Sequence, residues 1–248
     1  MKPARRVFVV SAAHTNFLGR GRPDFIYRGH PDHGVRENPG TEEHLKEAVE
    51  GAFAAAGLDP ASVDKAYLSN FLGERFCNQG HMGALLPRVC PGLEGKPIMR
   101  VEAACASGAA AVAAGVDSIQ AGADSVLCAG VEIETNVRGR EGVEHMALAA
   151  HYAKQRQLEF ALFPYFFARR AKHYKEAFGA GYEDIARVVA KAYGNASRNP
   201  KALKRDVEVS LEQAATASKH NSPFLEDPEL HDHIRILDCT AFTDGASA

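Results

Sequence analysis

One short stretch of the chain combines residue types that could perform nucleophilic chemistry. Cys105 is followed by Ala106, Ser107 and Gly108, and it stands between an apolar segment ending at Val101 and a run whose period predicts a helix. At the N-terminus of a helix, unpaired backbone N–H groups and the helix dipole favour a thiolate over a thiol. The same N–H groups can stabilise a developing oxyanion. We therefore expect Cys105 to be a nucleophile.

The helix that follows Cys105 is predicted to be buried. Residues 106–115 are Ala, Ser, Gly and Val on every side, and a helix that is apolar all round is normally covered. Such a helix suits the middle layer of a stack, between two sheets or against a second copy of itself. The alternative is that Cys105 is a buried structural cysteine, the commoner fate of a free Cys, but this interpretation does not explain its position at a helix start.

Composition excludes several other classes of protein. The 248 residues are 46% hydrophobic and 24% charged, as in an ordinary globular protein, and the net charge of −2 gives no reason to expect a nucleic acid or a membrane as partner. Five cysteines without a CxxC pair argue against a disulfide framework and favour a reducing, cytoplasmic location. The apolar run at residues 7–13 is too short for a signal peptide or a membrane span.

Strands and helices are expected to alternate along the first part of the chain, which predicts a parallel α/β sheet. The expected strands cover residues 7–10, 66–70, 98–101 and 125–129. Thr41 is expected to cap a helix that Gly57 ends, and residues 78–88 to form another. The strand at 125–129 is almost wholly apolar, so we expect it to be covered on both faces.

Helical periods replace this alternation from Arg138 to Asp232. Ser210 and Gln213 form a predicted capping box for a short helix. Two longer helices are each expected to present one apolar face, made of Phe167, Ala171, Tyr174 and Phe178 in the first and of Ile185, Val188, Val189, Ala192 and Tyr193 in the second.

The segment VEAACASGAAAVAAGVDSIQAGADSVLCAGVE, residues 101–132, resembles the nucleophile region of the thiolases. Residues 52–73, AFAAAGLDPASVDKAYLSNFLG, also resemble the pattern before the second strand of that family. Residues 166–202 are closer to the sterol-carrier-protein-type and archaeal-type branch than to the bacterial biosynthetic enzymes. The resemblance implies the thiolase fold, of which this chain would supply the N-terminal βαβαβαβ half with an inserted, mostly helical loop domain.

The resemblance also implies a division of the chain. Residues 1–132 would form the N-terminal α/β domain with the nucleophile, residues 133–235 a helical loop domain over the active site, and residues 236–248 a return segment with the start of the last strand. The second half of the family's duplicated fold carries a His that activates the nucleophile and a second Cys that acts as acid and base. It has no counterpart in these residues, so we expect activity to require that half.

The activity implied is that of an acyl-CoA acyltransferase, which forms or cleaves a 3-ketoacyl-CoA through an acyl-cysteine on Cys105. Its substrates would be CoA thioesters, with no permanently bound cofactor. Expected partners are acyl-CoA, CoA, a second copy in a homodimer or tetramer that uses the strand at 125–129, and a second chain carrying the C-terminal half. The alternatives are another condensing enzyme of this fold, such as a ketosynthase or an HMG-CoA-synthase-like enzyme, and a non-catalytic subunit that binds acyl-CoA.

Other candidate site residues carry weaker signals. Arg169 and Arg170 could bind CoA phosphates, because Arg suits phosphate recognition, but they could equally belong to a solvated helix face. His231 and His233 are spaced to share one face, yet no third or fourth ligand follows, so we expect no metal site. The remaining cysteines are interpreted as structural: Cys77, Cys90, Cys128 and Cys239.

Overall fold

The computed structural model describes residues 5–248, which form two compact units. The first contains the residues up to 18 together with 23–136 and 243–248, and the second contains 19–22 and 137–242. The chain therefore leaves the first unit after Asn136 and returns to it at Thr243. Each unit is described by itself below.

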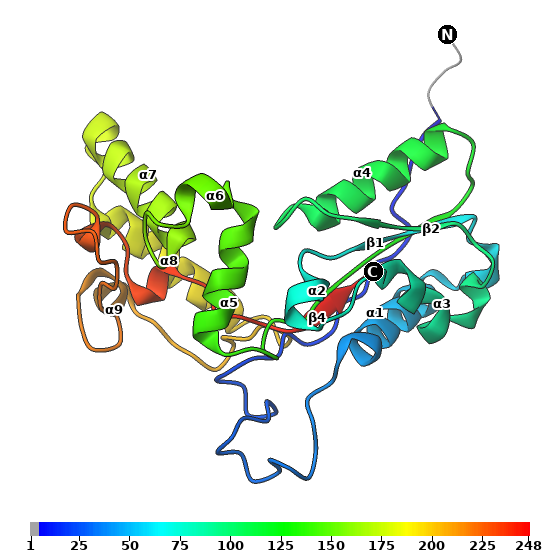
Figure 1. The fold of residues 1–248 in the computed structure, drawn as a ribbon, viewed down its shortest axis with the longest axis horizontal. Helices are drawn as coiled ribbons and strands as arrows, with labels where there is room; N and C mark the ends of the chain where they lie inside the picture. The colour runs from blue at the N-terminus through cyan, green and yellow to red at the C-terminus, as the bar shows by residue number, and fades with distance from the viewer. Residues whose placement is uncertain (1–4) are drawn as a thin grey trace. The chain divides into compact units, whose positions relative to one another are not determined.

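The first unit is built on a four-stranded sheet with the strand order β2-β1-β3-β4 (Figure 1). Strand β1 (Lys65–Ser69) pairs in parallel with β2 (Ile98–Val101) on one side and with β3 (Val126–Glu132) on the other. Strand β4 (Gly245–Ser247) lies antiparallel to the end of β3. Parallel strands joined through helices confirm the α/β class.

Helices lie on both faces of this sheet. Helix α4 (Ser107–Gln120) covers one face, and α1 (Thr41–Ala56) and α3 (Leu85–Val89) cover the other (Figure 1). The short helix α2 (Gly73–Phe76) follows β1, and 3-10 turns cover Pro60–Ser62, Met82–Ala84 and Pro91–Leu93. The helix expected at 78–88 is thus replaced by a 3-10 turn and the shorter α3.

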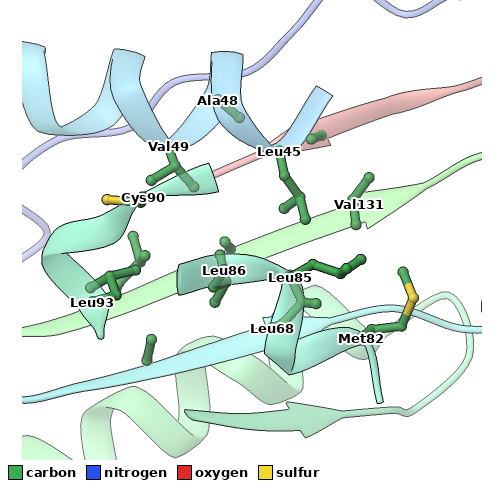
Figure 2. Close-up of a cluster of buried hydrophobic side chains, with 14 of the residues drawn as sticks. Leu45, Ala48, Val49, Leu68, Met82, Leu85, Leu86, Cys90, Leu93 and Val131 are labelled. Atoms are coloured by element: carbon green, nitrogen blue, oxygen red, sulfur yellow. The ribbon is translucent and has the colours of Figure 1, made fainter. Parts of the chain in front are cut away.

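The main hydrophobic core lies between α1, α3 and the sheet. Figure 2 shows Leu45 of α1 and Leu86 of α3 pointing toward Leu68 of β1 and Val131 of β3. Burying a side chain of this size stabilises the fold by roughly 1.5–3 kcal/mol relative to leaving it exposed. This core fixes the orientation of the strands, whose carboxyl ends carry the candidate site.

Helix α1 ends where the sequence predicts but begins with a different cap. Gly57 follows it in the left-handed region, at φ 63°, so the predicted end is confirmed. The N-cap is Gly40 rather than Thr41, and its N–H donates to the Glu43 carboxylate at 3.0 Å. The acidic side chain three residues into the helix therefore replaces the expected hydroxyl cap.

The first expected strand, residues 7–10, does not form. Phe8 is 67% exposed and Val9 85% exposed, and neither belongs to the sheet. The segment after it pairs instead with the end of the chain, because Ala13 and Ala248 exchange backbone hydrogen bonds of 2.8 and 2.9 Å. The β-branched composition predicted a strand, but strand formation depends on a pairing partner that composition does not identify.

The strand expected at 125–129 forms as β3, although its predicted burial is wrong. Its side chains alternate between buried and half-buried rather than being covered on both faces. It also lies inside the sheet between β1 and β4, so the outermost strands are β2 and β4. Strand β4 pairs with β3 at residues 130–132, so the predicted association through residues 125–129 stays a prediction.

Helix α4 is buried on one side only, which corrects the prediction of burial all round. Ser107, Ala111 and Gly115 face the sheet and are buried. Val112 is 51% exposed and Val116 37% exposed on the opposite side. In the described chain nothing covers this apolar face.

The second unit is helical, with two small cores. One contains Ala168 and Leu230, and the other contains Val189 and Ala214. The capping box predicted at Ser210 is confirmed, since its Oγ accepts from the Gln213 N–H at 3.1 Å. The helices of this unit are α5 (Gly139–Met146), α6 (Tyr152–Gln155), α7 (Leu162–Phe178), α8 (Tyr182–Ala196) and α9 (Leu211–Ala215), with 3-10 turns at Ala147–Ala149, His231–His233 and Ile236–Asp238.

The predicted apolar face of α7 points to solvent. Phe167, Tyr174 and Phe178 are all more than half exposed, whereas Leu162 and Ala168 are buried. In α8, Val189 is buried as expected but Val188 is exposed. Period alone identifies an apolar face without identifying what packs against it.

Candidate active site at Cys105

Cys105 lies in the turn that joins β2 to α4. Strand β2 ends at Val101 and helix α4 begins at Ser107, so the predicted strand-to-helix position of the cysteine is confirmed. Cys105 is exposed, Cys90 is buried, and the other three cysteines are half-buried. Of the five thiols, Cys105 is therefore the one most accessible to a substrate.

The turn has a strained backbone directly before the cysteine. Ala104 adopts φ 49°, in the left-handed region, which costs a residue with a Cβ roughly 1–2 kcal/mol. The Ser107 hydroxyl accepts from the Ala103 N–H at 2.9 Å and donates to the Ala104 carbonyl at 2.6 Å. The Glu102 carboxylate accepts from the Ala104 N–H. Side-chain hydrogen bonds from both sides thus hold the unusual conformation.

The carboxyl ends of the three parallel strands bring further polar groups to the same edge of the sheet. After β1, the Asn70 amide donates to the Val131 carbonyl at 2.8 Å and accepts from the Gly73 N–H at 2.8 Å. At the end of β3, the Glu132 carboxylate accepts from the N–H groups of Phe71 and Leu72 at 2.7 and 3.3 Å. These bonds hold the segment after β1 against the end of β3, beside strand β2, which leads to Cys105.

Burial raises the pKa of each of the other four thiols, so they remain protonated at neutral pH. The pKa of Cys239 rises to about 11, first through burial and then through the nearby Asp238 carboxylate. The Cys128 Sγ donates to the Ala111 carbonyl at 3.3 Å, inside the α4–sheet packing. These environments favour structural roles for the four residues.

The structure places Arg169 and Arg170 on α7, in the second unit, and both are exposed. Their guanidinium groups lie over aromatic rings of the same helix, at 5.8 Å from Tyr165 and 5.4 Å from Phe167. Cation–π contacts of this kind leave the N–H donors available to an anion. Binding of CoA phosphates by these residues therefore remains a prediction.

The two histidines considered as metal ligands lie in a 3-10 turn. His231 Nδ1 is 3.0 Å from the Leu225 carbonyl, and burial lowers the pKa of His233. Residues 5–248 contain no group of three or more His, Cys, Asp or Glu side chains placed to hold a metal ion. Over the same residues, no helix has the length and apolar content needed to cross a membrane.

A buried polar cluster in the first unit was not predicted. It contains His44 on α1 and Asp244 before β4, with the half-buried Glu134 after β3 beside them. Burial raises the pKa of Asp244 and, together with the Glu132 and Asp244 carboxylates, raises that of Glu134 to about 7. The position of His44 beside Leu45, on the face that also carries Ala48, was the available signal, since its burial follows from the helical period.

The fold and the site together define an α/β domain that presents an exposed cysteine between a parallel strand and a helix N-terminus. The family model for the thiolase N-terminal domain matches residues 25–229. Acetyl-CoA acetyltransferase of Methanothermobacter thermautotrophicus is 34% identical over 205 residues, which cover 82% of this chain and 50% of that protein. The chain therefore belongs to the thiolase family, as its sequence motifs predict.

Solved structures show the same fold. Human mitochondrial 3-ketoacyl-CoA thiolase superposes with a TM-score of 0.62 at 17% identity, over 97% of this chain and 64% of that one. The Ltp2-ChsH2(DUF35) aldolase superposes with a TM-score of 0.63 at 22% identity, over 96% of this chain and 53% of that one. The chain thus has the N-terminal half of the thiolase fold, and it spans half the length of the acetyltransferase that it matches.

Proposed function

We propose that the protein containing this chain is a thiolase-type acyltransferase that uses Cys105 as its nucleophile. The observation that carries the proposal is the exposed Cys105 thiol in the turn before α4, inside the region matched by the family model. The Cys105 thiolate would attack the carbonyl of an acyl-CoA, forming the new thioester bond while the CoA thiolate leaves. Either CoA or the α-carbon of acetyl-CoA then takes the acyl group.

Cysteine suits this reaction because a thioester preserves both the electrophilicity of the carbonyl and the acidity of the α-proton. Condensation also requires a base for that α-proton and donors for the enolate oxygen. We propose that a C-terminal half supplies this base and these donors. That half would be either a separate partner chain or a further part of the same protein. The same proposal has four further parts: the domain division at residues 132 and 235, a homodimer or tetramer, CoA contacts made by Arg169 and Arg170, and a cytoplasmic location.

The test is thiolysis of acetoacetyl-CoA by CoA, with peptide mapping of the acyl-enzyme. Cys105→Ala should abolish both turnover and acyl labelling, while Cys239→Ala, which changes a half-buried thiol in the second unit, should leave turnover within about twofold. Turnover or acyl labelling that survives in Cys105→Ala would contradict the proposal. Light scattering of the intact protein tests the oligomer.

The same assay separates the alternatives. Acyl labelling of Cys105 followed by condensation without thiolysis would favour a ketosynthase-like or HMG-CoA-synthase-like enzyme. Binding of acyl-CoA without labelling would favour a non-catalytic subunit.

A further inference from the structure

Ser107 is the first residue of α4, and its side chain is directed back at the turn that carries Cys105. It is only 6% exposed, although it begins a helix otherwise rich in Ala and Gly. Its hydroxyl makes two hydrogen bonds, accepting from the Ala103 N–H at 2.9 Å and donating to the Ala104 carbonyl at 2.6 Å. Both of its partners precede Cys105, while Ser107 itself follows it. The hydroxyl thus closes the turn around the cysteine.

The backbone of the same turn makes matching bonds. The Ala106 N–H donates to the Ala103 carbonyl at 2.9 Å, and the Ser107 N–H donates to the Ala104 carbonyl at 3.0 Å. The Ala104 carbonyl consequently accepts from both the amide and the hydroxyl of Ser107. In this turn Ala104 lies in the left-handed region, at φ 49°. An alanine keeps this unfavourable conformation only where the surrounding structure stabilises it.

We propose that Ser107 is a positioning residue for Cys105, because its hydroxyl locks the 103–107 turn and so keeps the thiol at the N-terminus of α4. The proposal rests on the proposed nucleophilic role of Cys105. A hydroxyl is required here because it can accept and donate at once within a residue or two of its own backbone. Alanine would leave the Ala103 N–H without this partner and would free Ala104 to relax.

A second substitution should compensate for the loss of the Ser107 hydroxyl. Glycine tolerates positive φ without support, so Ala104→Gly removes the strain that the Ser107 hydroxyl holds. If Ser107 acts by holding Ala104, then Ala104→Gly should compensate for Ser107→Ala. If Ser107 contributes only packing, then the glycine should not compensate.

The experiment measures alkylation of each cysteine of the chain by iodoacetamide at near-neutral pH, with peptide mapping. Ser107→Ala should slow labelling of Cys105 about tenfold, from the lost hydrogen bonds and the relaxed turn. Ser107→Thr, which keeps the hydroxyl, and the double variant Ser107→Ala with Ala104→Gly should both stay within about threefold of the wild type. Labelling of Cys77 and Cys239 in the same samples reports any general loosening of the fold, because loosening would increase the alkylation rate of these two half-buried thiols.

Ser118→Ala is the matched control. Ser118 lies near the other end of α4, and its hydroxyl makes a partly buried contact, 2.8 Å from the Tyr67 hydroxyl. It should leave Cys105 labelling within about twofold of the wild type. The proposal is overturned if Ser107→Ala labels Cys105 at the wild-type rate, if Ser118→Ala slows it equally, or if neither Thr nor the glycine rescue restores it.

Failure of the proposed function has a different signature. In that case Cys105 of the wild type would not be labelled before Cys77, Cys90, Cys128 and Cys239, or would carry no acyl group after incubation with acetoacetyl-CoA. The ratio of Cys105 labelling between Ser107→Ala and wild type would still measure positioning. The two conclusions are therefore tested separately.

Discussion

Asp244 and Thr135 are joined by two hydrogen bonds although they lie far apart in the sequence. The Thr135 N–H donates to one carboxylate oxygen of Asp244 at 2.9 Å, and the Thr135 hydroxyl donates to the other at 2.5 Å. The Glu134 N–H donates to the same carboxylate at 2.8 Å. Because the chain leaves the first unit after Asn136 and returns at Thr243, Asp244 fastens the two ends of that excursion together.

Replacing Asp244 should therefore destabilise the first unit. Asp244→Ala removes one acceptor group and leaves the N–H groups of Glu134 and Thr135 without their partner, so we expect a loss of about 2–4 kcal/mol in the free energy of unfolding. Asp244→Asn keeps one acceptor oxygen and should lose less. Urea denaturation followed by circular dichroism measures both. Equal stability of Asp244→Ala and wild type would show that this carboxylate does not fasten the two segments.

Glu134 should make stability depend on pH. Its pKa is raised from 4.5 to about 7, mainly by burial and further by Glu132 and Asp244, while the Thr243 N–H acts in the opposite direction. The folded state thus holds a proton that the unfolded state releases above pH 4.5. The stabilisation is fully present below that pH and is lost as pH rises through about 7.

We expect unfolding free energy to fall by about 2–3 kcal/mol between about pH 5 and pH 8 through this residue. Glu134→Gln should flatten that decline, whereas Glu94→Gln, at an exposed position in the same unit, should leave it unchanged. Urea titrations at several pH values give the comparison. A decline of the same size in Glu134→Gln would assign the effect to other groups.

His44 presents the opposite case, a residue whose replacement should stabilise the protein. It is 3% exposed, and among residues 5–248 neither ring nitrogen has a hydrogen-bond partner. Burial lowers the pKa of His44, although the Asp244 carboxylate opposes that shift. An uncompensated buried polar group is costly.

His44→Leu should therefore raise the free energy of unfolding by about 1–2 kcal/mol at neutral pH, because leucine fills the site with apolar atoms. Lys46→Leu, on the exposed side of the same helix, controls for helix propensity. Thermal and urea unfolding measure the difference. A loss of stability in His44→Leu, with none in Lys46→Leu, would mean that the imidazole has a partner worth more than leucine packing.

The parts of this fold that sequence predicts are those with a local cause. Gly57 ends α1 because a left-handed residue is needed there, and Ser210 caps α9 with its own hydroxyl. Cys105 was found because a strand, a cysteine and a helix follow one another directly in the chain. None of these inferences requires knowledge of what packs where.

The parts that sequence reasoning missed depend on partners distant in the chain. Phe8 and Val9 have strand composition but no strand beside them, and Phe167 marks a helix face that turned out to be exposed. The left-handed conformation of Ala104 has no sequence signal, because glycine or asparagine would be expected there. The Asp244–Thr135 bonds join residues that no local pattern connects.

The last prediction concerns the exposed face of α4. Val112 and Val116 lie on it, 51% and 37% exposed, and we expect a C-terminal half to cover them. We expect residues 1–248 expressed alone to lack thiolysis of acetoacetyl-CoA, and to gain it when co-expressed with a C-terminal half that supplies the base and the residue activating Cys105. Val112→Asp should prevent that gain, because it places a charge in the interface.

The control for this prediction is Gln120→Asp, at an exposed polar position of the same helix, which should leave the gain of activity intact. Circular dichroism of the lone chain should be the same for wild type and Val112→Asp, since Val112 is already half exposed. Co-purification of the two halves, followed by a thiolysis assay, reads out both assembly and activity. Full turnover by residues 1–248 alone would refute the prediction and would require a base among the histidines of this chain, with His14, His81, His145 and His151 as the first candidates for replacement by alanine.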